Sequence, residues 1–376
     1  MKTLKDIPVL QGVKVLLRAD FNVPVRNGVV ADQYRIQAAL PTVDFLRSKG
    51  AKVVMISHLE SNDGGNGSLQ PIADVLEKLG QPVEFIKDWK RALGSIEALS
   101  DGSCILLENV RLFDGEKKND PKFAAELASL ADIYVNDAFP VSHREHASIV
   151  GVPKLLPSYA GLQLEKEITN LSRAFSPAHP FLFILGGAKF ETKLPLLQKF
   201  TELADSVFVG GALANDIFKK RGYEIGQSLV SKNDIDLSGF ISSPKLLVPA
   251  DIINQSGQAK PADGLSKTDN IMDSGPKTIE MLKEKIAGAQ FILWNGPLGM
   301  YEDGYKKPTM ELARLIGVAT ERGADTIVGG GDTLAAIAEL GAQEKFSFIS
   351  TGGGAMLDFL AKGTLPGIEA LEQSKV

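Results

Sequence analysis

Two groups of residues in this 376-residue chain are suited to holding phosphate, and they fall in opposite halves of the sequence. The group in the N-terminal half consists of arginines, histidines and short polar side chains. Most of them stand just after short apolar runs; they are Asp20, Asn22, Arg35, His58, Asn109, Arg111, His143, Arg144 and His146. An arginine guanidinium pairs with carboxylate or phosphate through two parallel hydrogen bonds. Several arginines directed at one pocket therefore predict a binding site for a small, highly charged anion.

The group in the C-terminal half consists of glycines with a few charged residues among them. Its members are Gly186-Gly187, Gly210-Gly211, Gly296, Gly329-Gly330-Gly331 and Gly352-Gly353-Gly354, accompanied by Lys189, Lys193 and Asp332. Glycine-rich turns before helices bring backbone N–H groups close to phosphate, at the positive end of the helix. Gly331-Asp332-Thr333 precedes a predicted helix over Leu334–Leu340. The Asp332 carboxylate suits Mg²⁺, which prefers oxygen ligands.

Strands and helices alternate along the whole chain, and this alternation must position both groups. The predicted strands are Val13–Arg18, Lys52–Ser57, Val83–Ile86, Cys104–Glu108, Ile133–Asn136, Phe181–Leu185, Ser206–Val209, Lys245–Val248, Phe291–Trp294, Thr326–Val328 and Phe346–Ile349. Such alternation predicts an α/β fold with parallel sheets covered by helices on both faces. Ligands of open parallel sheets bind beyond the carboxyl ends of the strands, where the polar residues and glycines stand.

Length and composition limit what the chain can be. A chain of 376 residues predicts two domains or three. Residues 151–180, with four prolines around one helical stretch (Leu162–Phe175), are the expected connector. The net charge of −5 argues against a nucleic-acid partner.

The single cysteine, Cys104, cannot form an internal disulfide, which fits a reducing compartment. No apolar run approaches the roughly 20 residues that cross a bilayer, and residues 1–8 lack the apolar stretch of a signal peptide, so we expect a cytoplasmic protein with no membrane partner.

Several common phosphate- and metal-binding motifs are absent from the sequence. It contains no G-x-x-x-x-G-K-[ST], which excludes the ordinary P-loop, and no G-x-G-x-x-G, which removes support for a dinucleotide-binding fold. No cluster of cysteine and histidine has zinc-site spacing. The patterns therefore indicate a two-domain protein that handles phosphate without a P-loop.

The chain resembles the phosphoglycerate kinase family in a series of segments that follow the family's order from end to end. The opening segment is Leu17-Arg18-Ala19-Asp20-Phe21-Asn22-Val23-Pro24. The others are Ser57-His58-Leu59, Glu108-Asn109-Val110-Arg111, Val135-Asn136-Asp137-Ala138-Phe139, His143-Arg144-Glu145-His146-Ala147-Ser148, Gly186-Gly187-Ala188-Lys189, Trp294-Asn295-Gly296-Pro297, Gly329-Gly330-Gly331-Asp332-Thr333 and Ser350-Thr351-Gly352-Gly353-Gly354-Ala355. A single segment of this kind is weak support, whereas the whole ordered series is specific.

The resemblance implies two Rossmann-like domains that face each other across a hinged cleft. Residues 1–160 would bind 3-phosphoglycerate or 1,3-bisphosphoglycerate, 161–176 would form the hinge, 177–364 would bind magnesium ADP or ATP, and about 365–376 would return to the first domain. The implied glycerate ligands are Asp20, Asn22, Arg35, His58, Arg111 and Arg144. The implied nucleotide ligands are Gly187, Lys189, Lys193, Gly211, Asn295, Pro297, Glu302, Gly331, Asp332 and Thr333, with Asp332 on the Mg²⁺. A monomer is the family expectation.

The implied reaction is a reversible, direct in-line phosphoryl transfer between 1,3-bisphosphoglycerate and ADP, which gives 3-phosphoglycerate and ATP. Catalysis of such a step is mostly positioning and electrostatic stabilisation of charge on the equatorial oxygens. Arg35, Lys193 and the amides of Gly352, Gly353 and Gly354 are the candidate catalytic groups. No covalent nucleophile is needed.

The sequence also departs from the family pattern. Leu59-Glu60-Ser61-Asn62 stands where the family usually has Leu-Gly-Arg-Pro, so Ser61 takes the place of an arginine and Glu60 adds a negative charge. Pro140 and Ala212 replace glycines, and Thr192 replaces an aspartate. We expect weaker substrate binding, because a lost charge-assisted hydrogen bond costs about 1.5–3 kcal/mol.

Two other functions compete with the enzyme. The altered glycerate half could belong to a weakened paralogue that binds nucleotide as a scaffold or regulator. A two-domain binding protein that closes on an anion without reaction is the second alternative, although such proteins are commonly exported. The coupled assay of turnover with 3-phosphoglycerate and magnesium ATP separates the three.

Overall fold

The computed structural model describes residues 1–61, 64–89, 92–188, 193–232 and 236–374. The chain divides into two compact units. Unit 1 is Met1–Thr169 together with the segment from Lys362 onward, and unit 2 is Asn170–Ala361. Among the described residues, none of the helices combines the length and the apolar character that a bilayer crossing requires.

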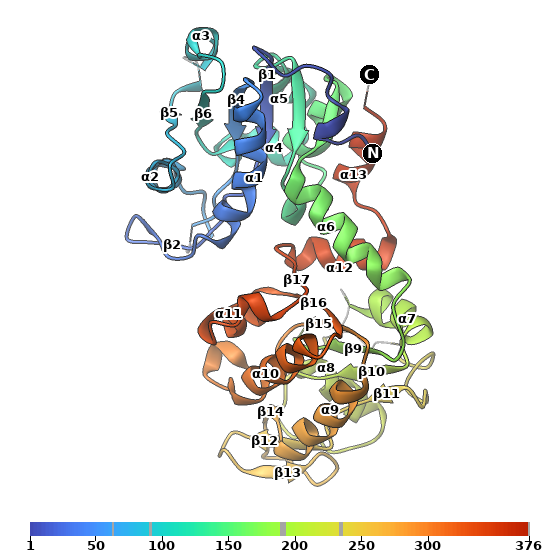
Figure 1. The fold of residues 1–376 in the computed structure, drawn as a ribbon. Helices are drawn as coiled ribbons and strands as arrows, with labels where there is room; N and C mark the ends of the chain where they lie inside the picture. Colours follow the sequence, from blue (N-terminus) through green and yellow to red (C-terminus); the bar gives the residue numbers. More distant parts are fainter. Residues whose placement is uncertain (62–63, 90–91, 189–192, 233–235, 375–376) are drawn as a thin grey trace. The chain divides into compact units, whose positions relative to one another are not determined.

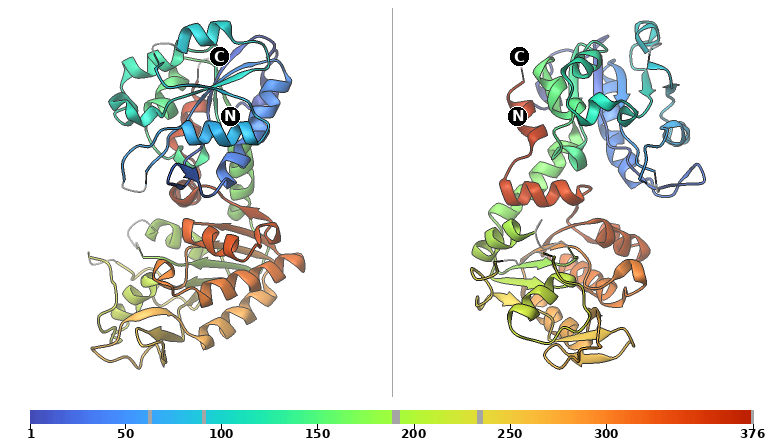
Figure 2. Two further views of the ribbon diagram at one scale, coloured as in Figure 1. Left: turned by 90° about the vertical axis from the view of Figure 1, so that its left-hand side faces the viewer. Right: turned by 180° about the vertical axis from the view of Figure 1, so that it is seen from behind.

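Unit 1 is built on a six-stranded sheet in which every neighbouring pair is parallel (Figures 1 and 2). The strands, in spatial order, are β5 (Glu84–Ile86), β6 (Cys104–Leu107), β4 (Lys52–Ile56), β1 (Lys14–Arg18), β7 (Ile133–Asn136) and β8 (Ser158–Ala160). Its helices are α1 (Tyr34–Ser48), α2 (Gln70–Lys78), α3 (Ala92–Ala98), α4 (Asp114–Lys117), α5 (Pro121–Ala128) and α13 (Pro366–Glu372). Helices lie on both faces of the sheet, as the strand–helix alternation predicts.

The core of unit 1 follows from the apolar pattern of β1, β4 and α1. Val15, Leu17, Val53 and Met55 are fully buried, and α1 packs on the sheet through a stripe that includes Ile36. Helix α1 ends just before Gly50, whose φ of +77° is a left-handed conformation that glycine adopts without strain.

Unit 2 contains a second six-stranded parallel sheet. In spatial order its strands are β11 (Leu246–Leu247), β10 (Ser206–Val209), β9 (Phe181–Leu185), β15 (Phe291–Asn295), β16 (Asp325–Gly329) and β17 (Phe348–Ile349). The helices are α7 (Leu194–Leu203), α8 (Ala212–Lys220), α9 (Pro276–Gly288), α10 (Lys307–Glu321), α11 (Gly331–Glu339) and α12 (Gly353–Lys362) (Figure 1). Helix α6 (Leu162–Ser172) begins in unit 1 and ends in unit 2.

Several strands were not among those that the sequence predicts. Unit 2 carries a three-stranded antiparallel sheet of β13 (Ala259–Pro261), β12 (Asp251–Asn254) and β14 (Ile271–Ser274). Unit 1 has the β2–β3 hairpin (Val25–Arg26 and Val29–Val30) and the edge strand β8. These strands are only two to four residues long, so they lack the longer apolar runs that mark the central strands.

The strand registers bring the candidate site residues to one edge of each sheet. In unit 1, Arg18 at the end of β1 pairs with Ile56 of β4 and with Asn136 of β7. In unit 2, Asn295 at the end of β15 pairs with Leu185 of β9 and Gly329 of β16. Residues that follow these strands therefore converge.

Candidate active site

In unit 1 the residues after β1 and β4 form a hydrogen-bonded charged cluster. Arg35, in the first turn of α1, places Nη1 3.1 Å from Oδ2 of Asp20 and donates to the carbonyl oxygen of Asn22 at 3.2 Å. The backbone N–H of Asn22 in turn donates to Oδ1 of Asp20 at 3.3 Å. Asp20 is 7% exposed and Arg35 29% exposed at the side chain, so the carboxylate is fixed and the guanidinium retains access to solvent.

Arg18, the last residue of β1, is completely buried beside this cluster. It donates to the hydroxyl of Ser148 at 3.0 Å and to the carbonyl oxygen of Ala19 at 2.5 Å. The Ser148 hydroxyl donates onward to Glu116, also fully buried, at 2.6 Å. A buried charge requires a compensating one, so Glu116 is the distant counter-charge of Arg18.

His58, after β4, is held as a neutral imidazole. Burial first, and then the charges of Arg18, Arg111 and Arg35, place the pKa of His58 well below its ordinary value. Arg18 Nη2 lies 3.2 Å from His58 Nδ1, and because arginine can only donate, Nδ1 accepts and Nε2 carries the proton. The 4.0 Å approach of His58 to Asp20 is therefore not an ion pair.

Arg111 follows β6 in the short helical turn Val110–Leu112 and pairs with Glu60. Its side chain is 6% exposed, and Nε has no hydrogen-bond partner among the residues that the structure describes. The same turn is fixed by Asn109, whose Oδ1 accepts from the Arg111 N–H at 2.9 Å. Arg111 is thus a buried cation whose ion-pair partner is the Glu60 carboxylate.

Arg144 lies on an exposed turn after Phe139–Val141, so it is the most solvent-accessible of the predicted arginines. Nearby His146 has its pKa lowered to about 4 by burial and then by Arg111, Arg18 and Arg144. Three arginines therefore act on one imidazole, although the largest cause of its shift is burial. The positive charge of these arginines favours a polyanion.

In unit 2 the glycines that follow the strands pack backbone against backbone. Gly186 N–H donates to Asn295 at 2.8 Å and Gly187 N–H to Pro297 at 3.1 Å. Gly211 has φ +61°, and a Cβ there would lie 2.7 Å from the Gly187 nitrogen. This approach is open only to glycine, and it fixes the turn at the start of α8.

Lys193 precedes α7 and folds inward over this junction. Its Nζ donates to the Gly186 carbonyl oxygen at 2.5 Å, and the residue is 8% exposed. Burial lowers the pKa of Lys193 to about 8, while the carboxylate of Asp332 opposes that shift. Lys189 and Thr192 lie outside the described residues.

A cavity of about 200 Å³ opens beside the glycine junction. Five predicted nucleotide residues line it: Gly187, Gly211, Pro297, Glu302 and Asp332. Ala212, Asn215, Leu229, Met272, Asp273 and Tyr301 also line it and were not predicted as ligands. Burial raises the pKa of Asp273 to about 7. Asp273 is hard to find from sequence because it lies in one of the unpredicted antiparallel strands.

Other predicted nucleotide residues stand at the start of α11 and at the end of β15. Gly330, with φ +106°, precedes α11, and Asp332 and Thr333 stand in its first turn. The buried Thr333 hydroxyl accepts from the Gly296 N–H at 3.0 Å. Asn295 is also buried, with Nδ2 3.7 Å from the sulfur of Met356. Neither Asn295 nor Thr333 lines the cavity.

The last glycine group, Gly352-Gly353-Gly354, stands at the start of α12. Gly352 N–H donates to the Ser350 hydroxyl at 3.2 Å, and α12 starts at Gly353. Gly354 is exposed and Gly353 half-buried. The N–H groups of the first helical turn have no acceptor within the helix, so this terminus can receive an anion.

Asp332 suits a metal that arrives with phosphate. Within the described part of the chain, no three histidine, cysteine or carboxylate side chains group as a metal site. Mg²⁺ is typically held by one or two carboxylates together with substrate phosphates and water. Asp332, in the first turn of α11 and on the cavity wall, fits that mode.

Comparison with known proteins identifies the family. A family model described as phosphoglycerate kinase matches residues 4–363. The chain belongs to the phosphoglycerate kinase family. It is 42% identical to the phosphoglycerate kinase of Dictyoglomus turgidum and 40% identical to that of Thermosipho africanus, with 99% of this chain covered in each case and 99% and 98% of the relatives.

Solved structures agree with this assignment. The phosphoglycerate kinase from Coxiella burnetii matches with a TM-score of 0.84 at 35% identity, covering 99% of both chains. The enzyme from Pyrococcus horikoshii OT3 matches with a TM-score of 0.86 at 32% identity, covering 99% of this chain and 98% of that one. The family places the chain among phosphotransferases, and a nucleotide-binding scaffold is not favoured by these matches.

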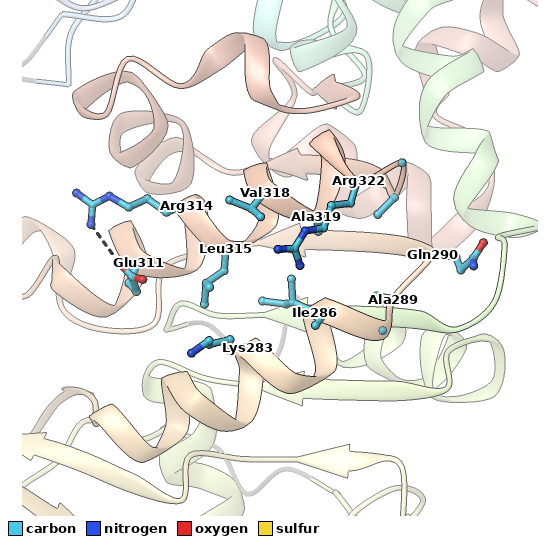
Figure 3. Close-up of a pocket in the computed structure, with 14 residues that line it drawn as sticks. Lys283, Ile286, Ala289, Gln290, Glu311, Arg314, Leu315, Val318, Ala319 and Arg322 are labelled. Atoms are coloured by element: carbon cyan, nitrogen blue, oxygen red, sulfur yellow. Dashed lines mark hydrogen bonds and ion pairs between the residues drawn. The ribbon is translucent and has the colours of Figure 1, made fainter.

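Another hollow in unit 2 lies away from the residues that the family resemblance implies as ligands. This groove, of about 500 Å³, runs between α9 and α10 and is lined by Lys283, Ile286, Arg314, Val318 and Arg322 among others (Figure 3). Arg314 is paired with Glu311 at 3.1 Å. The groove stands at the amino ends of β15 and β16, opposite the edge where ligands of parallel sheets bind.

Proposed function

We propose that the charged cluster of unit 1 binds 3-phosphoglycerate or the acyl phosphate, and that the cavity of unit 2 binds magnesium ADP or ATP. The observation that carries this proposal is the difference between the two sites. Unit 1 gathers Arg18, Arg35 and Arg111 around a neutral His58, which suits a small polyanion. Unit 2 offers a glycine-lined cavity bordered by a helix N-terminus, which suits a nucleotide and its phosphates.

The reaction that fits these sites is a reversible in-line transfer from 1,3-bisphosphoglycerate to ADP. Arg35 would neutralise charge on the transferring group from the glycerate side, since its guanidinium is partly exposed and oriented by Asp20. Lys193 and the first amides of α12, at Gly352, Gly353 and Gly354, would do so from the nucleotide side. Fixed donors of this kind stabilise a phosphoryl-transfer transition state without a covalent intermediate.

The metal would be a partner of the nucleotide. Asp332 would hold Mg²⁺, and the ion would supply positive charge to neutralise the charge that develops during transfer. Glu302 and Pro297 line the cavity and would contact the nucleoside part of the substrate. Because the two substrates belong to different units, the reaction would require hinge closure, with residues 161–176 as the expected hinge.

The oligomeric state and the cellular compartment are also part of the proposal. We propose a cytoplasmic monomer, with the single free Cys104 buried and therefore not available for intermolecular disulfides. Size-exclusion chromatography with light scattering of the purified chain gives one species near 40.3 kDa on this proposal. A larger stable species contradicts it.

The experiment that tests the function is a coupled assay. Purified protein is mixed with 3-phosphoglycerate and magnesium ATP, and acyl phosphate formation is followed. The proposal predicts saturable turnover that requires both substrates and is abolished by a chelator of Mg²⁺. Binding of nucleotide without turnover would instead support a scaffold.

A further inference from the structure

Glu60 contacts Arg111, the most buried of the three arginines predicted as glycerate ligands. Its carboxylate is ion-paired and hydrogen-bonded with Nη1 of Arg111. The two partners differ in burial, because the side chain of Glu60 is 55% exposed and that of Arg111 is 6% exposed. Arg111 is therefore fixed in the protein, whereas the glutamate side chain can turn away into solvent.

Arg111 needs an anion at this position. Burial lowers the pKa of Arg111, and the like charge of Arg18 lowers it further. The charges of Glu60 and Glu116 act in the opposite direction and favour the charged guanidinium. Glu116 is already bonded to both the N–H and the hydroxyl of Ser148. Among the described residues, only Glu60 is recorded in a direct ion pair with Arg111. Leaving a buried guanidinium unpaired is costly, so the pair forms whenever no other anion is present.

The backbone that carries Glu60 is fixed by neighbours on three sides. Its N–H donates to Oδ1 of Asn22 at 2.9 Å, which ties it to the same segment that orients Arg35. Asn109 Nδ2 donates to the carbonyl oxygens of Leu59 and Gly67 at 2.8 and 2.7 Å. Asn66 forms an isolated antiparallel β-bridge with Glu60, and its Nδ2 donates to the Arg111 carbonyl oxygen at 2.7 Å. Only the side chain of Glu60 is left to move.

We propose that Glu60 is an internal anion that occupies Arg111 in the empty enzyme and is displaced by the phosphate of the glycerate substrate. This inference rests on the proposed function, since it takes Arg111 to be a substrate ligand. Glu60 thereby sets the affinity for the glycerate substrate and has no part in the transfer step. Its carboxylate and the substrate phosphate compete for one guanidinium.

Competition has a simple quantitative consequence. If Arg111 is unoccupied in a fraction of the molecules, the observed Kd is the intrinsic Kd divided by that fraction. A partly exposed pair of this kind is weak to moderate in strength. Removal of the competing charge in Glu60→Gln is therefore expected to lower the Kd and the KM for 3-phosphoglycerate by about three- to tenfold, on this relation between occupancy and affinity. The kcat and the KM for magnesium ATP stay unchanged.

The test measures 3-phosphoglycerate binding by calorimetry and turnover by the coupled assay for wild type, Glu60→Gln and Glu126→Gln. Glu126 is an exposed residue of α5 that forms no ion pair within the part of the chain that the structure describes. Its substitution changes the net charge equally and serves as the control. The proposal predicts tighter binding in Glu60→Gln alone. It also predicts a matching decrease in the inhibition constant of inorganic phosphate against 3-phosphoglycerate.

A double-mutant cycle assigns the effect to Arg111. In an Arg111→Met background, Glu60→Gln is expected to give no further change in the Kd for 3-phosphoglycerate, since the contested cation is gone. An equal gain in both backgrounds overturns the proposal, and so does a Glu60→Gln protein that binds no more tightly than wild type. A wild-type protein that neither binds nor turns over 3-phosphoglycerate would instead refute the proposed function itself.

Discussion

The guanidinium of Arg35 is held 3.1 Å from the carboxylate of Asp20, which lies two residues beyond the end of β1. The same Nη1 also donates to the Asn22 carbonyl oxygen. Two acceptors on one short loop fix the side chain in a single direction while leaving part of it exposed. A positioned but accessible guanidinium is what phosphoryl transfer requires of a transition-state ligand.

Removal of this guanidinium should therefore affect the chemical step. Arg35→Ala is expected to lower kcat by roughly 10³-fold or more, by analogy with arginines that contact the transferring group in other phosphotransferases. The fold should be retained, because Arg35 is not part of the core. Steady-state kinetics and circular dichroism check both statements.

Arg26→Ala is the matched control for Arg35→Ala. Arg26 is exposed in the β2–β3 hairpin, and its substitution removes the same charge from unit 1. We expect kcat of this variant within twofold of wild type, as is usual for exposed sites. Normal turnover by Arg35→Ala would remove Arg35 from the mechanism.

Lys193 predicts an alkaline limit to activity. Its pKa of about 8 means that the free enzyme loses this charge as the pH rises through that value. The kcat/KM for magnesium ADP, which reports groups of the free enzyme, should therefore decline above about pH 8. In Lys193→Met the decline is expected to disappear and kcat to fall about 10²-fold, as for the loss of one transition-state donor. A wild-type profile that is flat to pH 9.5 would contradict this role.

His146 predicts acid sensitivity of unit 1. Its pKa is about 4 in the folded protein and 6.5 as the ordinary value, so between these limits the unfolded chain binds more protons. Stability that is present above about pH 6.5 is therefore lost as the pH falls toward 4. Urea unfolding at pH 7 and pH 5 should show a smaller loss for His146→Gln than for wild type. A remaining loss is expected from His58, whose pKa is lowered in the same direction.

Asp137 predicts the opposite dependence. Its Oδ1 accepts from the N–H groups of Gln163 and Leu164 at the start of α6, and burial raises its pKa to about 7. The folded protein therefore binds more protons than the unfolded chain between about pH 4 and 7, and stability is lost as the pH rises through 7. Asp137→Asn retains an oxygen acceptor for the helix and removes the charge. Its unfolding free energy relative to wild type should increase from pH 5 to pH 8. No change would show that Asp137 is already ionised in the folded protein at pH 5, so that its pKa is not raised.

The central strands could be predicted from the sequence because they are buried on both faces. The predicted ranges for β7, β9 and β10 coincide with the observed ones, and β1, β4 and β15 agree to within one residue. Each of these strands contains a run of at least three apolar residues, as is typical of strands buried in parallel sheets. Strands β8, β12, β13 and β14 could not be found, because they are short and their side chains do not alternate in a recognisable way.

The candidate site was only partly visible in the sequence. Residues that follow strand ends were found, since topology alone places them together. The buried charged partners Arg18 and Glu116 were not predicted. Ser148 joins them by hydrogen bonds, and the three residues lie more than 30 positions apart in the chain, so no local sequence pattern predicts the pair. Glu60 was recognised as a departure from the family pattern, but its contact with Arg111 depends on the turn that joins residues 59 and 67.

The assignment of one substrate to each unit is most directly tested by hydrogen exchange with mass spectrometry, with each ligand added alone. 3-Phosphoglycerate should slow exchange in peptides around Asp20, His58 and Arg111 and leave unit 2 unchanged. Magnesium ADP should slow exchange around Gly211, Pro297 and Asp332 and leave unit 1 unchanged. Protection of the Gly211 and Asp332 peptides by 3-phosphoglycerate alone, with none around Arg111, would contradict the account.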